Sequence, residues 1–112
     1  MVALSEITPE LAELIAARMR VIGDPMRIRI LDLLRGGELS VGEITARVGT
    51  SQQNASKHLG ILLQAGIVGR RKEGTTSLYR LVDLSIFELC EQICGGLQQQ
   101  IAGLSAVVDS AA

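Results

Sequence analysis

Residues 40–66 read SVGEITARVGTSQQNASKHLGILLQAG, and this stretch predicts two short helices joined by a tight turn. Ser40 and Glu43 have the spacing of a capping box, in which each side chain accepts a hydrogen bond from the other residue's backbone, so the first helix is expected to follow Ser40 and to run through Val48. Gly49 supplies the turn, because glycine adopts backbone angles that other residues avoid.

The second helix of this stretch follows a cap at Thr50 or Ser51 and ends at Gly66. Its apolar residues form one stripe, namely Ala55, Leu59, Leu62 and Leu63. Its other side presents polar groups, at Gln52, Gln53, Ser56, Lys57 and Gln64. Two short helices joined in this way form a candidate helix-turn-helix motif. Amides near a helix N-terminus can pair with adenine in the major groove, and the N-terminus attracts phosphate, so we predict that this side reads duplex DNA.

A basic hairpin is predicted directly after this helix. Strands are expected over residues 67–72 and 77–82, on either side of a turn at residues 73–76 that contains Gly74. A basic hairpin beside a polar helix suits a duplex, because one element can read the major groove while the other grips phosphates. The alternative interpretation is an ordinary solvated surface.

The distribution of charge agrees with an anion-binding middle segment. The chain has 11 Lys and Arg against 12 Asp and Glu, a net charge of -1. Residues 1–46 carry -2, residues 47–80 carry +5 and residues 81–112 carry -4. A basic segment between acidic ends indicates one face that meets an anion while the rest faces water.

Composition excludes several classes of protein. A chain of 112 residues that is 47% hydrophobic suits one domain with a core, and 2% aromatic residues leave no stacking platform for single-stranded nucleic acid. No apolar run approaches the ~18 residues that cross a bilayer, so we expect no membrane association. The N-terminus lacks the pattern of a secretory signal. The two cysteines are therefore expected to be reduced thiols of a cytoplasmic protein.

Two further helices are expected before the capping box. Thr8-Pro9-Glu10 predicts the start of a helix over residues 8–22, since threonine caps and proline suits the first helical position. Asp24-Pro25 predicts the start of another helix by the same reasoning, and Gly36-Gly37 ends it.

A long final helix is expected over residues 84–108. Its apolar residues recur at steps of three and four, at Leu84, Phe87, Cys90, Cys94, Leu97, Ile101, Leu104 and Val108. This spacing is typical of a heptad seam and predicts a partner surface, of which a second copy of the chain is the simplest. The alternative is packing of this helix within one chain. Gly95-Gly96 inside it predicts either a kink or the close approach of two helices.

Three stretches of the chain resemble a known family. Residues 23–34 read GDPMRIRILDLL, residues 51–59 read SQQNASKHL, and residues 63–74 and 78–81 read LQAGIVGRRKEG and LYRL. They are similar to the second helix, the recognition helix and the wing of the ArsR/SmtB-type winged helix-turn-helix repressors of bacteria. The match runs in register over roughly residues 8–100.

The resemblance implies a mainly α fold with a small β-hairpin wing and about five helices. It implies one DNA-binding domain over residues 1–112, with the helix-turn-helix at 41–65, the wing at 67–82 and dimerisation through helices 8–22 and 84–108. A homodimer would then bind a two-fold symmetric operator and release it when an effector binds. The predicted dimer interface comprises Leu11, Leu14, Phe87, Leu97, Ile101 and Leu104.

The predicted DNA contacts lie on the recognition helix and the wing. Those on the helix are Ser51, Gln52, Gln53, Asn54, Ser56, Lys57 and His58. Those on the wing, expected along phosphate, are Arg70, Arg71, Lys72, Thr75, Thr76 and Arg80. His58 borders the apolar stripe, so a packed side chain is its alternative interpretation.

The effector stays open at this point. One metal site of the family uses two cysteines at positions that here hold Ser40 and Gly42. The other runs along the final helix, where Asp83 matches but Ser85, Gly96 and Gln99 do not. Since zinc wants about four ligands, neither site can be carried over.

Cys90 and Cys94 remain as the candidate effector residues. With their mates in a dimer they could gather four thiolates for a soft metal ion of unknown identity, or take part in thiol chemistry between subunits. The alternative is that both only pack, because a buried cysteine behaves as a small hydrophobe.

We predict a sequence-specific regulator of transcription that acts on double-stranded DNA, most simply a repressor. A winged-helix module that binds proteins instead of DNA is the alternative. An enzyme is not expected, because the chain has one histidine, no phosphate-binding loop and no recognisable pair of nucleophile and base.

Overall fold

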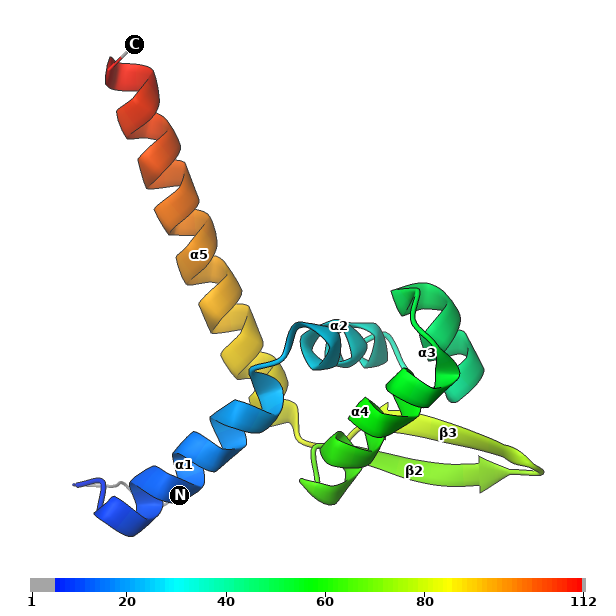
Figure 1. Ribbon diagram of the computed structural model, residues 1–112. Helices are drawn as coiled ribbons and strands as arrows, with labels where there is room; N and C mark the ends of the chain where they lie inside the picture. The colour runs from blue at the N-terminus through cyan, green and yellow to red at the C-terminus, as the bar shows by residue number, and fades with distance from the viewer. Residues whose placement is uncertain (1–5, 112) are drawn as a thin grey trace. The chain divides into compact units, whose positions relative to one another are not determined.

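The computed structural model describes the backbone of residues 6–111 and the side chains of residues 6–103. The chain divides into two compact units, one ending at Val82 and one beginning at Asp83. The first unit contains α1 (Pro9–Ile22), α2 (Pro25–Leu34), β1 (Leu39–Ser40), α3 (Val41–Val48), α4 (Gln52–Gln64), β2 (Val68–Glu73) and β3 (Thr76–Leu81). The second unit is α5 (Leu84–Ala111) (Figure 1). The expected winged helix-turn-helix architecture, mainly α with a hairpin, is confirmed.

Helices α1 and α2 begin where the capping signals predict. The Thr8 hydroxyl accepts a hydrogen bond from the backbone N–H of Leu11 at 3.1 Å. The Asp24 carboxylate accepts from the N–H groups of Met26 and Arg27 at 2.9 and 3.2 Å. Each cap satisfies donors that the first turn of a helix leaves without partners.

The predicted capping box holds the start of α3. The backbone N–H of Glu43 donates to the Ser40 hydroxyl at 3.2 Å, and the backbone N–H of Ser40 donates to the Glu43 carboxylate at 3.0 Å. Gly49 ends α3 with a φ of 68°, in the left-handed region, and this conformation turns the chain toward α4. Of the two caps considered for α4, Ser51 is the one that accepts from the backbone, at Asn54.

The sheet contains one more strand than expected. Its order is β1-β3-β2 with antiparallel pairing throughout, and the two-residue strand β1 was not predicted from the sequence. The turn is also shorter than the predicted residues 73–76, because Glu73 pairs with Thr76 and only Gly74 and Thr75 connect the strands. A two-residue hairpin loop favours a positive φ, and Gly74 has a φ of 65°.

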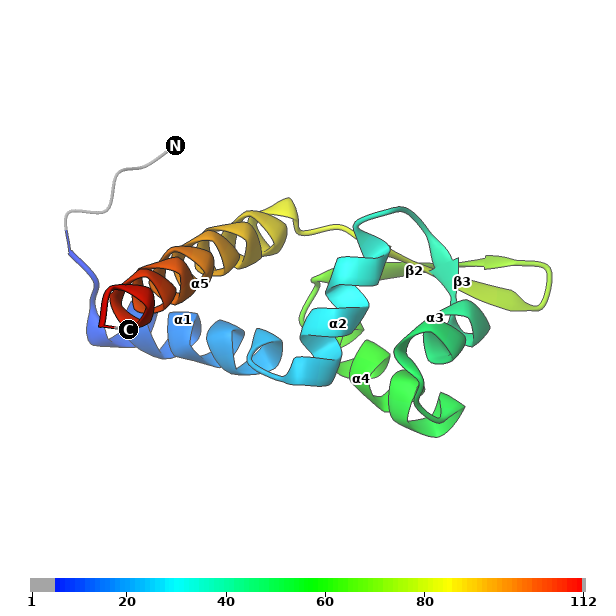
Figure 2. The ribbon, with the colours of Figure 1, turned by 90° about the horizontal axis from the view of Figure 1, so that it is seen from above.

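The core of the first unit lies between the helices and one face of the sheet. Residues with no exposed surface come from several elements: Ile30, Ile44, Ala55, Leu59, Leu62 and Ile67. Burial of each large apolar side chain contributes about 1.5–3 kcal/mol. Because α4 turns its apolar stripe into this core, its polar side stays at the surface. Figure 2 shows the β2–β3 hairpin projecting past α2, α3 and α4.

Helix α5 runs without interruption through Gly95 and Gly96. Within the described residues, large apolar side chains of α5 are exposed at Leu84, Ile93, Leu97 and Ile101. The side chains of Leu104 and Val108 lie outside the described residues. None of the described helices has the combination of length and apolar character needed to span a membrane.

Candidate nucleic-acid interface

The first turns of α4 form an exposed polar surface. Ser51, Gln52, Gln53, Ser56 and Lys57 are all exposed, while Ala55 between them is fully buried. A shallow hollow in this surface is lined by Ser51, Gln53, Asn54 and Lys57. Amide, hydroxyl and ammonium groups at a helix N-terminus supply the donors and acceptors that base edges and phosphates require. The structure therefore brings most of the predicted recognition residues together.

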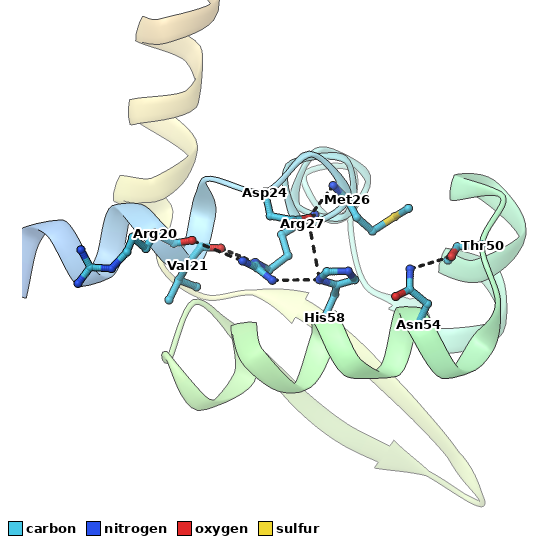
Figure 3. Close-up of polar contacts among 8 residues, drawn as sticks. All are labelled: Arg20, Val21, Asp24, Met26, Arg27, Thr50, Asn54 and His58. Atoms are coloured by element: carbon cyan, nitrogen blue, oxygen red, sulfur yellow. Dashed lines mark hydrogen bonds and ion pairs between the residues drawn. The ribbon is translucent and has the colours of Figure 1, made fainter.

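Asn54 takes part in the turn as well as in the surface. Its side-chain Nδ2 donates to the Thr50 hydroxyl at 2.9 Å, and its backbone N–H donates to the Ser51 hydroxyl at 3.1 Å. Asn54 is half-buried, and its amide nitrogen is already bonded (Figure 3). These two hydrogen bonds fix the shape of the turn that precedes α4.

His58 does not lie on the exposed surface. His58 is only 7% exposed. Its ring nitrogen Nδ1 lies 3.1 Å from Nη1 of Arg27 and 4.0 Å from a carboxylate oxygen of Asp24 (Figure 3). The expectation of a groove contact therefore does not fit its position, whereas the packed alternative does. The reason is helical spacing, since residue 58 follows Ala55 by three and shares its buried side.

Arg27 links three helices, α1, α2 and α4, and was not among the residues predicted for the site. Its Nε donates to the carbonyl of Val21 and its Nη2 to the carbonyl of Arg20 at 3.4 Å, both in the last turn of α1 (Figure 3). The same guanidinium meets His58 on α4. It thus satisfies carbonyls that the end of α1 leaves open and positions the recognition helix against them. The sequence offers one signal for this contact: His58 borders the apolar stripe of α4, which indicates a packed side chain.

The register of the hairpin separates the wing cations onto two faces. Directly opposed residues of an antiparallel pair point to the same side of a sheet. Arg70 pairs with Tyr79 and Lys72 with Ser77, on the face that holds buried Val68 and is covered by helices near its base. Arg71 pairs with Leu78, and Arg80 pairs with Gly69, on the opposite face. The four cations that were predicted to lie along phosphate are therefore divided between two faces of the hairpin.

Arg71 is bound by two carboxylates. Its Nε donates to both carboxylate oxygens of Glu38, at 3.1 and 2.9 Å, and its Nη2 reaches Glu38 at 2.7 Å and Glu73 at 3.0 Å. Hydrogen bonding from Arg71 holds the pKa of Glu38 below its ordinary value, and Glu38 in turn raises the pKa of Arg71. Arg71 is thus the one predicted wing contact with strong partners within the described protein.

The tip of the wing is polar and exposed. Thr75 lies in the two-residue turn and Thr76 begins β3, and both are exposed. The side chains of Arg70 and Lys72 make no ion pair within the part of the chain that the structure describes. These two cations are therefore free to meet an external anion.

The two cysteines differ in exposure. Cys94 is exposed and Cys90 is half-buried, and neither forms a disulfide. Partial burial raises the pKa of the Cys90 thiol, which lowers its thiolate fraction. Residues 6–103 contain no group of three or more His, Cys, Asp or Glu side chains that could hold a metal ion.

The residues predicted for dimerisation vary in exposure. Leu14 of α1 and Leu97 and Ile101 of α5 are 69%, 53% and 65% exposed. Leu11 and Phe87 are half-buried. Three of the predicted interface residues therefore present large apolar side chains to solvent.

Comparison with known proteins adds an independent line of evidence. A model of a helix-turn-helix domain matches residues 22–71. Rv0081 of Mycobacterium tuberculosis, an uncharacterized HTH-type transcriptional regulator, is 39% identical over 80 residues, which span 70% of each protein. The biofilm growth-associated repressor of Agrobacterium fabrum is 34% identical over 79 residues, or 70% of this chain and 68% of the repressor.

Solved structures agree with these relatives. The crystal structure of Rv0081 matches 85% of this chain and 96% of its own, with a TM-score of 0.77 and 33% identity. The solution structure of Mb0332 from Mycobacterium bovis, a homodimeric winged helix-turn-helix DNA-binding domain and possible ArsR-family regulator, matches 90% of this chain and 94% of its own, with a TM-score of 0.74 and 28% identity.

Proposed function

Since the chain belongs to the ArsR/SmtB-type family of winged helix-turn-helix transcriptional regulators, we propose that it represses transcription by binding a two-fold symmetric operator as a homodimer. The observation that carries this proposal is the exposed polar side of α4, together with the wing cations Arg70 and Lys72, which make no ion pair within the described residues. Gln52, Gln53 and Ser56 would contact base edges in the major groove. Lys57, Arg70 and Lys72 would contact phosphate, with Thr75 at the wing tip.

Exposed apolar residues on α1 and α5 support the homodimer. Leu14, Leu97 and Ile101 present large apolar side chains to solvent, and the related Mb0332 domain is homodimeric. A two-fold dimer places its recognition helices about 34–36 Å apart, one turn of duplex, so both can enter the major groove. Residues 81–112 carry four acidic side chains and no Lys or Arg, which favours a position for α5 away from phosphate.

We assign effector release to Cys90 and Cys94, the only thiols of the sequence. The effector would be a thiol-reactive compound or a soft metal ion held by thiolates of both subunits. Counting of free thiols and elemental analysis on protein purified without chelator tests this assignment. If neither bound metal nor thiol reactivity is found, the two cysteines serve only in packing.

We also propose where the protein acts in the cell and that it has no catalytic activity. A regulator that binds chromosomal operators works where the chromosome lies, so we place it in the cytoplasm. Its relatives are regulators of transcription, and we propose no catalytic activity for it.

Selection from a random duplex library tests the function directly. The full chain is incubated with the library, bound duplexes are sequenced, and the recovered site is titrated at two salt concentrations. We expect a recovered site with two inverted half-sites one helical turn apart and an affinity that falls steeply with salt. A library that yields no preferred sequence, with no binding at low salt, would favour the protein-binding module instead.

A further inference from the structure

Arg71 is poorly placed to contact phosphate in this structure, although its sequence neighbours Arg70 and Lys72 make no ion pair within the described residues. Its guanidinium bonds Glu38 through two nitrogens and also meets Glu73. A phosphate would have to displace Glu38 from a bidentate, charge-assisted contact, which is among the stronger kinds of hydrogen bond. Only 26% of the Glu38 side chain is exposed, so water competes for this carboxylate less than at an open surface.

The pair joins distant parts of the fold. Arg71 lies on β2 and Glu38 directly precedes β1, and β3 runs between these two strands. The residue after next, Ser40, is the cap of α3, the first helix of the helix-turn-helix. The contact therefore ties the outer strand of the wing to the start of the DNA-reading motif.

The face that holds this pair is electrically balanced, and the other face is not. Arg71 and Arg80 lie on one face with Glu38 and Glu73, and the Arg80 charge adds to the lowering of the Glu38 pKa. Arg80 also lies close over Gly69, where an added Cβ would come within 3.2 Å of its guanidinium carbon. Within the described wing, the opposite face carries Arg70 and Lys72 without any acidic residue.

We propose that Arg71 and Glu38 form an anchor that sets the position of the wing, and that the wing attracts phosphate through Arg70 and Lys72 instead. Glu38 and Arg71 are then positioning residues that affect sequence discrimination. The wing and α4 can contact one DNA site together only if the distance between them is fixed. This inference rests on the proposed DNA binding and assigns separate tasks to neighbouring residues of the wing.

Arg70 and Arg71 offer a matched test, because they are adjacent, chemically identical and on opposite faces. The full chain carrying Arg70→Gln, Arg71→Gln or Glu38→Gln is titrated with the selected operator and with a random duplex over a range of salt. Arg70→Gln is expected to lower the slope of log affinity against log salt by about one for each protomer. Arg71→Gln and Glu38→Gln are expected to leave the slope unchanged and to reduce the ratio of operator to random affinity about fivefold.

The double variant Glu38→Gln/Arg71→Gln is expected to match either single variant, because both remove the same contact. An equal loss of slope in Arg70→Gln and Arg71→Gln would overturn the proposal, as would full discrimination in Glu38→Gln.

Hydrogen exchange of the free protein separates this inference from the proposed function. Faster exchange of the β2 and β3 amides in Glu38→Gln and Arg71→Gln, but not in Arg70→Gln, is expected whether or not DNA binds. Wild-type protein that binds no duplex would overturn the function alone. Wild-type DNA binding together with unchanged wing exchange in both anchor variants would overturn the anchor alone.

Discussion

Two adjacent residues of α4 have opposite environments and predict opposite phenotypes. Lys57 is exposed at the proposed interface, whereas His58 is buried against Arg27. Lys57→Ala should weaken binding to every duplex and lower the salt slope by about one per protomer, with stability changed by less than about 0.5 kcal/mol. His58→Ala should lower the free energy of unfolding by about 1–3 kcal/mol, because it leaves a cavity and removes the acceptor of Arg27.

Urea unfolding and duplex titration of both variants measure these effects. A His58→Ala variant as stable as wild type would show that the Arg27 contact contributes nothing, and a Lys57→Ala variant with an unchanged salt slope would remove Lys57 from the interface. The identity of His58 as the buried member of this pair follows from helical spacing alone. Its partner Arg27 is 31 positions away, and only the packing of α2 on α4 brings the two together.

Three carboxylates predict how stability changes with pH. The pKa of Glu43 is lowered by the backbone hydrogen bond from Ser40, that of Asp24 by the backbone of Arg27, and that of Glu38 by Arg71. A depressed pKa in the folded state contributes stability that is present above the unfolded value, 3.8 for Asp and 4.5 for Glu, and is lost as pH falls through the folded value.

The urea midpoint should therefore decrease between about pH 6 and about pH 3. Glu43→Gln provides the control, because glutamine can keep the capping box but cannot titrate. This variant should lose less stability over the same range than wild type. Equal acid sensitivity of the two proteins would contradict the assignment of Glu43.

At the scale of elements, the glycines at 49 and 60 predict opposite effects of the same substitution. Gly49 links α3 to α4 with a φ of 68°, and an alanine there is strained by about 1–2 kcal/mol. Gly60 lies inside α4, exposed, with nothing within 4 Å of an added Cβ. Gly60→Ala should therefore stabilise the protein by about 0.5–1 kcal/mol. Thermal unfolding distinguishes the two, and equal shifts would show that the turn does not require glycine.

Capping signals are local, and this is why the starts of the helices could be predicted to within a residue or two, whereas α5 ends three residues after the predicted residue 108. The caps at Thr8, Asp24 and Ser40 each act within three residues of themselves. Strand β1 was not predicted because two residues are too few to show the alternation of apolar and polar residues that marks a strand. Its pairing with Tyr79 also depends on the β2–β3 hairpin. The turn was predicted one residue too wide at each end for a related reason, since the sequence does not show which residues pair across Gly74.

The two faces of the wing could be predicted from the sequence, but the partner of Arg71 could not. The strands were predicted, and the period of two in a strand already places Arg70 and Arg71 on opposite faces. What the sequence could not supply is the carboxylate partner, because Glu38 is 33 positions from Arg71 and reaches it only across β3. Consecutive charged residues of a strand thus lie on opposite faces of the sheet, and each face brings them to different neighbouring residues.

At the scale of the whole molecule, the proposed function depends on a second copy of the chain. One protomer offers one recognition helix and a few wing cations, which is little for a specific site. Two protomers double the phosphate contacts and fix the spacing of the half-sites. The heptad-like spacing of α5 predicts the helix and an apolar side, but a single chain does not reveal the partner that covers it.

Leu97→Glu tests this dependence, with Gln98→Glu as its control for added charge on the same helix. Leu97 is 53% exposed, so the glutamate can be accommodated in a single chain but would have to be buried without a partner in the proposed dimer. Light scattering should find Leu97→Glu monomeric and Gln98→Glu dimeric. The monomer should retain the helical circular dichroism of α1–α4, bind operator at least about tenfold more weakly, and show roughly half the wild-type salt slope, because one protomer neutralises half the phosphates. A Leu97→Glu protein that stays dimeric with full affinity would place the interface elsewhere than on this side of α5.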